Sequence, residues 1–387
     1  MIELRGAAQV LRLPDAPYLR HDRAAELSLV PGDLAVDAAE DAAIDASGCA
    51  VLPGFVDCHT HLPFAGWRAE EYERKVTGVP YEEIARAGGG IASSARSLAA
   101  ASDEEVLAQA GALAREMLEH GTTVFEGKTG YGLSREGEAR AARLGRELAA
   151  RVVQPMTVTG LFAHAVPPGF TADAWMDEAE ALARGCDVDA LDIFVESVAF
   201  GNVHLARMGT IAAATGRPLR AHVEQLSTMR SVPVALEHGA RSLDHLSLMH
   251  ADDIAPLAAA ECAAVLLPGA ELMNAEHTPP ARALADAGAI CVLATDFNPG
   301  TSPILSMPLI VGLAVRRYGW SVREALLAST LNAAWVLGRR PAADDVVLLD
   351  GPAEHVPYRP GHNPVAAVIA GGKLVHVRPD HAWRVTR

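Results

Sequence analysis

Two histidines separated by one residue, His59 and His61, form the first group in the chain that could do chemistry. They lie in a segment over residues 53–61 that is predicted to be a strand. In an extended strand, side chains alternate between faces, so both imidazoles are expected on one face. Two neutral imidazoles placed in this way can bind one divalent metal ion. The alternative for such a pair alone is two surface histidines on an edge strand.

Two more candidate ligands follow later apolar runs. His222 lies near the end of a predicted strand over 219–225, and Asp296 lies near the end of one over 291–298. A hydrolytic metal site uses three or four protein ligands and one open position, which holds a water of lowered pKa. Taken singly, His222 could be a structural histidine and Asp296 a turn residue. The predicted metal ligands are His59, His61, His222 and Asp296.

The middle of the chain must position these side chains, and it alternates between helices and strands. A helix predicted over 103–120 begins at Ser102, where Glu105 completes a capping box. The strands are nearly continuous apolar runs, as is typical of strands that are buried on both faces. They are predicted over 53–61, 121–128, 154–164, 190–196, 219–225, 242–247, 264–270 and 291–298. The pattern predicts an α/β fold, a (β/α)8 TIM-like barrel whose functional residues follow the strands. A doubly wound open sheet is the alternative.

The sequence pattern at the two ends of the chain differs from the alternation of helices and strands in the middle. Residues 1–52 and 342–387 read as short strands separated by turns that contain glycine and proline. We therefore predict a small β-sandwich domain built from both termini, with the barrel over 53–341. Half of the 387 residues are hydrophobic, which is sufficient for a large core.

Composition also excludes several classes of partner. The formal net charge of −15 and the pI near 5.4 argue against nucleic acid and anionic membranes. No apolar run reaches the length of a membrane span, and the N-terminus has no signal-peptide pattern. Five scattered cysteines are typical of reduced thiols, so we expect a cytoplasmic protein.

Several segments also carry a family resemblance. They cover residues 56–61, 61–68, 81–91, 128–133, 163–167, 266–270 and 294–303. Together they resemble the amidohydrolase superfamily and, more closely, its imidazolonepropionase family. The resemblance implies hydrolysis of the cyclic amide C–N bond of 4-imidazolone-5-propanoate, a small anionic heterocycle, to N-formimino-L-glutamate by a metal-activated water. It further implies one divalent ion per chain, zinc or iron, and a homodimer.

The resemblance also assigns roles to residues of this chain. The four predicted ligands fall on the family's metal-binding positions, and His245 falls on the histidine that supports the attacked carbonyl or the water. In the implied reaction, Asp296 accepts the proton of the water and His245 steadies the oxyanion. The implied substrate contacts are Arg68, Tyr131, His164, Gln225, Asn298, Gly300 and Thr301.

The chemistry of some of these residues agrees with the implied roles. Arg68 can form a bidentate pair with a carboxylate, although it could also be a surface charge. The segment 298–301 offers an amide, a hydroxyl and backbone N–H groups that are expected to form an anion cradle. Tyr131 could instead be a turn aromatic. Lys128 ends a predicted strand, and the sequence names no partner for it.

The segment after the fifth predicted strand bears on the reaction type. Gln225 follows His222 by three residues, where many deaminases of the superfamily resemble one another in carrying glutamate. Glutamine cannot transfer protons but can bind a ring amide, so it favours ring opening over deamination. The sequence leaves open whether Glu224 or Asp296 is the main proton acceptor.

Departures from the family pattern keep two other functions open. These departures are Phe162, Val195, Val223 and Glu224, which are expected near the pocket wall. One alternative is a hydrolase or deaminase of another small heterocycle. The other is a non-catalytic barrel that binds a small molecule.

Overall fold

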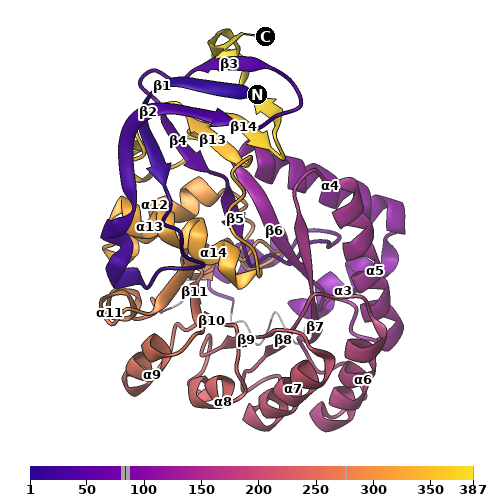
Figure 1. Cartoon of the computed structure of the whole chain (residues 1–387). Helices are drawn as coiled ribbons and strands as arrows, with labels where there is room; N and C mark the ends of the chain where they lie inside the picture. The colour runs from indigo at the N-terminus through magenta and orange to yellow at the C-terminus, as the bar shows by residue number, and fades with distance from the viewer. Residues whose placement is uncertain (80–82, 84–87, 275–276, 387) are drawn as a thin grey trace.

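The computed structural model describes residues 1–79, 83, 88–274 and 277–386. Within these residues, eight parallel strands form a barrel whose neighbours pair in chain order (Figure 1). This sequential order confirms the predicted barrel and excludes the doubly wound sheet. The barrel strands are β5 (Phe55–Asp57), β6 (Thr122–Lys128), β7 (Met156–Ala163), β8 (Ala190–Phe194), β9 (Leu219–Val223), β10 (Ser242–His245), β11 (Ala263–Leu266) and β12 (Ile290–Leu293).

Helices pack around the outside of the barrel (Figure 1). The predicted capping box is confirmed at the start of α4, since the Ser102 hydroxyl accepts from the Glu105 N–H and the Glu105 carboxylate accepts from the Ser102 N–H. The helices between barrel strands are α1 (Ala69–Val76), α3 (Ile91–Ala100), α4 (Asp103–Glu119), α5 (Arg135–Arg151), α6 (Ala172–Gly185), α7 (Asn202–Thr215), α8 (Ser231–Glu237), α9 (Ile254–Ala259), α10 (Pro268–Asn274) and α11 (Ala281–Asp286). The helices after the last barrel strand are α12 (Met307–Tyr318), α13 (Val322–Ser329), α14 (Leu331–Val336) and α15 (His355–Tyr358).

The first barrel strand is shorter than predicted. It ends at Asp57, so His59 and His61 lie beyond the strand and not within it. Thr60 instead makes an isolated bridge to Phe297, and the N–H of His61 donates to the carbonyl of Phe297 at 2.9 Å. Beyond Asp57 the chain thus bonds to the segment after β12 on one side, while the Thr60 carbonyl still accepts from the Lys128 N–H at 2.9 Å on the other.

The two termini form a second sheet beside the barrel (Figure 1). Antiparallel pairing of β4 with β13 joins the N-terminal and C-terminal parts, with Val347 opposite Leu52. The sheet has a core of its own, which contains Ile2, Leu4 and Ile44. Its strands are β1 (Ile2–Arg12), β2 (Ser28–Val36), β3 (Ala42–Asp45), β4 (Ala50–Pro53), β13 (Val346–Leu349), β14 (Val365–Ala370), β15 (Lys373–Val377) and β16 (Val385–Thr386). The domain boundaries near residues 52 and 342 stay a prediction.

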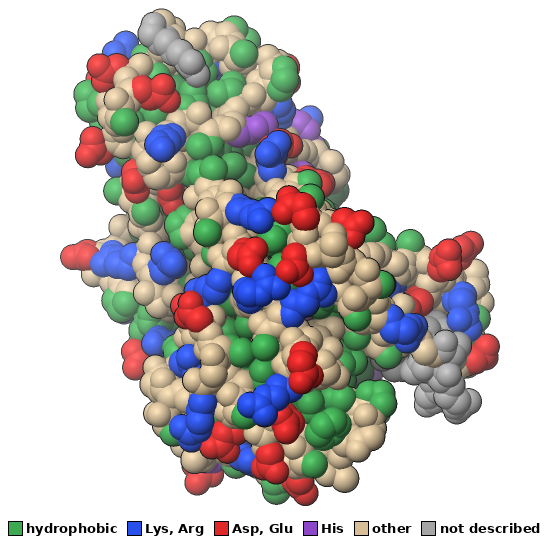
Figure 2. All heavy atoms as spheres, turned by 90° about the vertical axis from the view of Figure 1, so that its right-hand side faces the viewer, with side chains coloured by type: hydrophobic (Ala, Val, Ile, Leu, Met, Phe, Trp, Pro, Cys, Tyr) green, Lys and Arg blue, Asp and Glu red, His purple; other side chains and the backbone are tan. Residues whose placement is uncertain are grey.

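The outer surface over α4 and α5 has mixed charge. Figure 2 shows basic and acidic side chains interspersed on this face. Asp103, at the start of α4, accepts from Arg140 at 2.7 Å and from Arg143 at 2.6 Å, both on α5. Among the described residues, no helix combines the length and apolar character needed to cross a membrane.

Candidate metal centre

The predicted ligands meet at the carboxyl-terminal mouth of the barrel. The Nε2 atoms of His59 and His61 lie 3.4 Å and 3.2 Å from the same Oδ1 atom of Asp296. The His222 ring lies 4.5 Å from the His59 ring and 5.6 Å from the His61 ring, measured between centroids. All of these side chains are buried. The structure thus brings together residues that the sequence separates by more than 200 positions.

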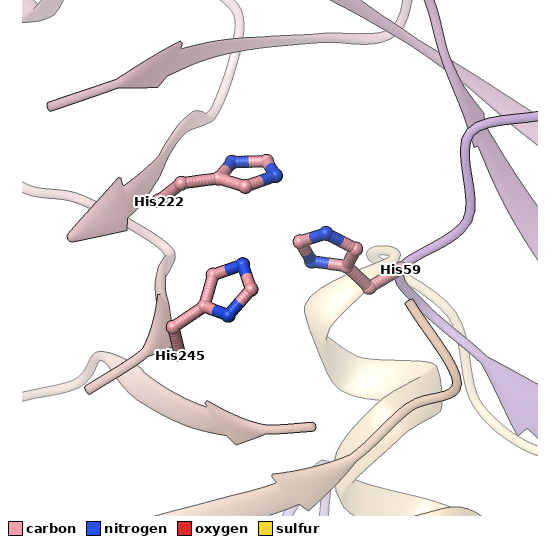
Figure 3. Close-up of side chains that lie close together, drawn as sticks. All are labelled: His59, His222 and His245. Atoms are coloured by element: carbon pink, nitrogen blue, oxygen red, sulfur yellow. The ribbon is translucent and has the colours of Figure 1, made fainter. Parts of the chain in front are cut away.

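His245 lies in the same cluster. Figure 3 shows His222 and His245 on neighbouring strands, with His59 facing them from the segment that follows the first barrel strand. Nitrogen atoms of these three histidines lie within 4.8 Å of one another. His245 is therefore close enough to contact a substrate or water bound beside the predicted ligands. Its particular role stays a prediction.

Two buried aspartates orient the histidine rings. Asp244 Oδ2 lies 2.6 Å from His59 Nδ1, and Asp192 Oδ1 lies 3.1 Å from His222 Nδ1. A carboxylate in this position selects the tautomer with hydrogen on Nδ1 and a lone pair on Nε2. Both Nε2 atoms are buried and have no hydrogen-bond partner among the described residues. Buried nitrogen lone pairs aimed at one place fit a divalent metal ion.

The electrostatics of the cluster favour a positive charge. Burial and nearby Lys128 oppose protonation of His59, but Asp244 and Asp296 outweigh them and raise its pKa to about 9. Burial raises the pKa of Asp296, but the adjacent imidazoles of His59 and His61 hold it well below its usual value. Burial lowers the pKa of His61 to about 4. The same carboxylates that stabilise a proton on His59 would stabilise a metal cation in its place.

Backbone strain is concentrated at the same mouth. His245, Asp296 and Glu224 have φ angles of 77°, 54° and 55°, in the left-handed region that non-glycine residues rarely adopt. Such strain persists where the surrounding structure holds it in place, most often at functional sites. Next to Asp296, Thr295 donates to Asp57 from its N–H at 3.1 Å and from its hydroxyl at 2.6 Å.

The Glu224 carboxylate is occupied by backbone hydrogen bonds in the loop after β9. Its carboxylate accepts from the backbone N–H of Met229 at 3.1 Å and of Ser231 at 2.6 Å, at the start of α8. Glu196 also shapes this loop, because its Oε2 atom accepts from the N–H of Leu226 at 2.9 Å. Between the two proton acceptors that the sequence leaves open, this geometry favours Asp296.

Two predicted substrate contacts lie beside the metal cluster. The rings of Tyr131 and His164 have centroids 5.9 Å and 5.5 Å from that of His61. His164 Nδ1 lies 3.0 Å from the carbonyl oxygen of Gly130, and burial holds the pKa of His164 well below its usual value. Burial also raises the pKa of Tyr131. Both side chains are therefore neutral hydrogen-bonding groups at the mouth.

Arg68 packs directly on the loop after β12. Its backbone N–H donates to the Pro299 carbonyl at 2.9 Å, and its guanidinium lies against Gly300. A Cβ atom at position 300 would lie 1.6 Å from Arg68 Nη2, so any larger residue there would displace the guanidinium. The Nε atom of Arg68 is buried and has no hydrogen-bond partner among the described residues.

The loop that contains Asn298 differs from the expected anion cradle. Asn298 Oδ1 accepts from the N–H of Gly300 at 2.9 Å and from the N–H and hydroxyl of Thr301 at 2.7 Å and 3.0 Å. Asn298 Nδ2 donates to the Asp296 carbonyl at 2.7 Å. These donors are used within the loop, because the asparagine side chain closes a turn. In this structure the segment shapes the wall behind Arg68 and Asp296.

The remaining predicted residues lie at varied depths. Gln225 is half-buried just beyond β9. Phe162, Val195 and Val223 belong to the main hydrophobic core, and the Phe162 carbonyl accepts from the Trp175 indole at 2.7 Å. Residues 81–82 and 84–87 of the resembling segment 81–91 lie outside the described residues.

Sequence reasoning missed a buried ion cluster below the metal centre. Lys128 Nζ lies 2.7 Å from Asp192, 2.9 Å from Glu126 and 3.8 Å from Asp244, and Arg220 pairs with Glu126. All five side chains are buried. The available signal was the presence of charged residues inside otherwise apolar strands, since such charges persist in a core only when they are paired.

Comparison with known proteins places this arrangement in a family. The model of the amidohydrolase family matches residues 50–343. Imidazolonepropionase from Rubrobacter xylanophilus is 43% identical over 86% of this chain and 83% of the relative. The enzyme of the same name from Paracoccus denitrificans is 39% identical over 89% of this chain and 90% of the relative.

Solved structures share the fold at much lower identity. Atrazine chlorohydrolase TrzN from Arthrobacter aurescens, in complex with zinc, has a TM-score of 0.67 and 16% identity, covering 97% of this chain and 95% of that one. Guanine deaminase from E. coli has a TM-score of 0.66 and 15% identity, covering 98% and 100%. With the family match and the relatives above, the chain belongs to the amidohydrolase family and, within it, to the imidazolonepropionases.

Proposed function

We propose that this enzyme hydrolyses 4-imidazolone-5-propanoate to N-formimino-L-glutamate by opening the ring at its cyclic amide C–N bond. The observation that carries the proposal is the convergence of His59, His61, His222 and Asp296 at the barrel mouth. The names of relatives that match most of the chain at about 40% identity support this substrate.

The donor set fits one divalent ion per chain, and we propose zinc or iron. Neutral imidazoles with one carboxylate suit both metals. An ion held by these residues would lower the pKa of a water and polarise the carbonyl of the substrate. Elemental analysis of the purified protein, expected to give about one ion per chain, identifies which metal is present.

Asp296 and His245 supply the proton chemistry in this proposal. Asp296 accepts a proton from the attacking water as the new C–O bond forms, and delivers it to the ring nitrogen as the C–N bond breaks. His245, which lies within the same cluster, steadies the negative charge that develops on the carbonyl oxygen.

The substrate is held by residues that surround the cluster. Arg68 pairs with the propionate group, since its guanidinium lies against Gly300 and retains a buried Nε without a partner among the described residues. Tyr131 and His164 contact the ring from the side of His61, and Gln225 binds the ring amide. Asn298, Gly300 and Thr301 support the wall on which Arg68 rests.

The test follows the ultraviolet absorbance of freshly prepared imidazolone propionate. The wild type is expected to accelerate its decay, whereas His222→Ala is expected to give only the uncatalysed rate. His250→Ala is the matched control, because this histidine is exposed. Equal decay with wild type, His222→Ala and buffer would refute the proposal. The predicted homodimer and cytoplasmic location stay predictions, and sedimentation velocity tests the first.

A further inference from the structure

Two buried carboxylates beneath the metal centre lie unusually close together. Asp192 and Asp244 orient His222 and His59 through hydrogen bonds to Nδ1. One oxygen atom of each lies within 4.8 Å of the other, and both side chains are fully buried. Two like charges at this distance repel each other strongly in a protein interior, because little water screens them.

Lys128 supplies the opposite charge between them. Its Nζ atom lies 2.7 Å from Asp192 Oδ2 and 3.8 Å from Asp244 Oδ2. A third carboxylate, Glu126, lies 2.9 Å from the same nitrogen. The side chain of Lys128 is fully buried, so these acidic groups and not solvent determine where the ammonium lies.

We infer that Lys128 is a positioning residue for the metal centre. Its ammonium holds Asp192 and Asp244 in the places from which each carboxylate orients one metal-binding histidine. The inference rests on the proposed function in taking His59 and His222 as ligands. Among the described residues, the ammonium of Lys128 is the cation that lies within 4 Å of both Asp192 and Asp244.

The inference makes metal affinity depend on a residue that is not a ligand. Without the ammonium, repulsion moves the two carboxylates apart, and the imidazole rings lose the partners that aim Nε2 at the ion. Loss of such orienting partners typically weakens metal binding by about 10- to 100-fold. Because both histidines depend on Lys128, the effect is expected near the upper end of that range.

Arg220 offers a matched control inside the same ion cluster. It is also buried, and it pairs with Glu126 while donating to the carbonyls of Cys58 and Val336 at 3.0 Å and 3.1 Å. The double variants Lys128→Met/Glu126→Gln and Arg220→Met/Glu126→Gln each remove one buried cation and one buried carboxylate. Only the first variant removes the cation that contacts Asp192 and Asp244, whereas the second removes the bonds of Arg220 to the two carbonyls.

The experiment measures the affinity of each folded double variant for Zn²⁺ by competition with a chromophoric chelator. The Lys128 variant is expected to bind Zn²⁺ about 10- to 100-fold more weakly than wild type, and the Arg220 variant to match wild type. At limiting Zn²⁺, the kcat of the Lys128 variant should fall while KM stays unchanged, because Lys128 contacts the carboxylates below the site.

Two results would overturn the inference: wild-type affinity in the Lys128 variant, or equal losses in both variants. If Lys128→Met/Glu126→Gln does not fold, Lys128→Gln/Glu126→Gln keeps a polar side chain there and is expected to show the same loss of affinity. Wild-type affinity in that variant would likewise overturn the inference. Failure of the proposed function is distinguishable, because the wild type itself would then bind no Zn²⁺ or show no turnover.

Discussion

The barrel mouth and the terminal sheet both contain fully buried side chains, but those of the sheet are apolar and those of the mouth are polar. In the terminal sheet, Ile2, Leu4 and Ile44 are at most 1% exposed, and they pack into a cluster of apolar side chains. At the mouth, His59 and His222 are similarly buried, but each has an Nε2 atom without a hydrogen-bond partner among the described residues. Burial therefore supports stability in one region and ligand binding in the other. Substitutions in the sheet should therefore change stability, and substitutions at the mouth should change activity or ligand binding.

The largest effect is expected for Asp296→Asn at the mouth. Loss of the proton acceptor should lower kcat by about 10²- to 10⁴-fold, while circular dichroism and the melting temperature of the metal-free protein change little. Asp286→Asn is the control, because Asp286 lies exposed on α11 and pairs with Arg282. If Asp296→Asn lost stability and activity in parallel, the contrast between the two regions would fail.

The reverse behaviour is expected for Ile44→Ala in the terminal sheet. Removing this buried side chain should lower the free energy of unfolding by about 2–5 kcal/mol, measured by urea denaturation. KM for the substrate and the affinity for Zn²⁺ should not change. Val30→Ala on β2 is the control, because Val30 is 42% exposed and should have a much smaller effect. An altered KM in Ile44→Ala would show that the sheet shapes the mouth.

Gly300→Ala sharpens the contrast within the mouth. The new methyl group would collide with the Arg68 guanidinium and displace it, so kcat/KM should fall by about 10- to 100-fold, mainly through KM. Gly111→Ala on α4 is the control, since a methyl group at position 111 would meet no heavy atom within 4 Å. That change should stabilise the helix by about 0.5–1 kcal/mol. Unchanged kinetics in Gly300→Ala would remove Arg68 from the substrate site.

The smallest effect is expected at His21, whose ring lies 4.2 Å from that of Trp320 and whose backbone N–H donates to the Ala289 carbonyl just before β12. Burial lowers the pKa of His21 to about 4, although Glu324 acts in the opposite direction. The folded state then favours neutral His21, so its contribution to stability is complete above pH 6.5 and is lost as the pH falls toward 4. Between pH 7 and pH 5 the loss should be about 2 kcal/mol.

Comparison of wild type with His21→Leu isolates this contribution from that of the carboxylates. The free energy of unfolding of the variant should depend less on pH between 7 and 5. Identical pH profiles for the two proteins would show that His21 does not set this dependence.

The sequence was most informative where one local rule sufficed. The spacing of His59 and His61 predicted that they act together, although both lie beyond the strand that was expected to hold them. The rule that functional residues gather at the ends of barrel strands pointed to His222 and Asp296. Lys128 could not be paired in the same way, because its partner Asp192 lies 64 residues away on another strand. For Asn298, turn chemistry was visible, but the direction of the neighbouring N–H groups depends on the folded loop.

The bridge between Thr60 and Phe297 has a mechanical consequence. Among the described residues, no regular ladder of hydrogen bonds joins β5 to β12. The barrel is therefore closed at this junction by the Thr60–Phe297 bridge and by the bonds from Thr295 to Asp57. His59 and His61 lie on the β5 side of this junction, and Asp296 lies on the β12 side. A cation bound by residues on both sides would stabilise this junction. Its removal should therefore first destabilise the junction, with faster amide exchange at His61 and Thr295 than elsewhere in the barrel.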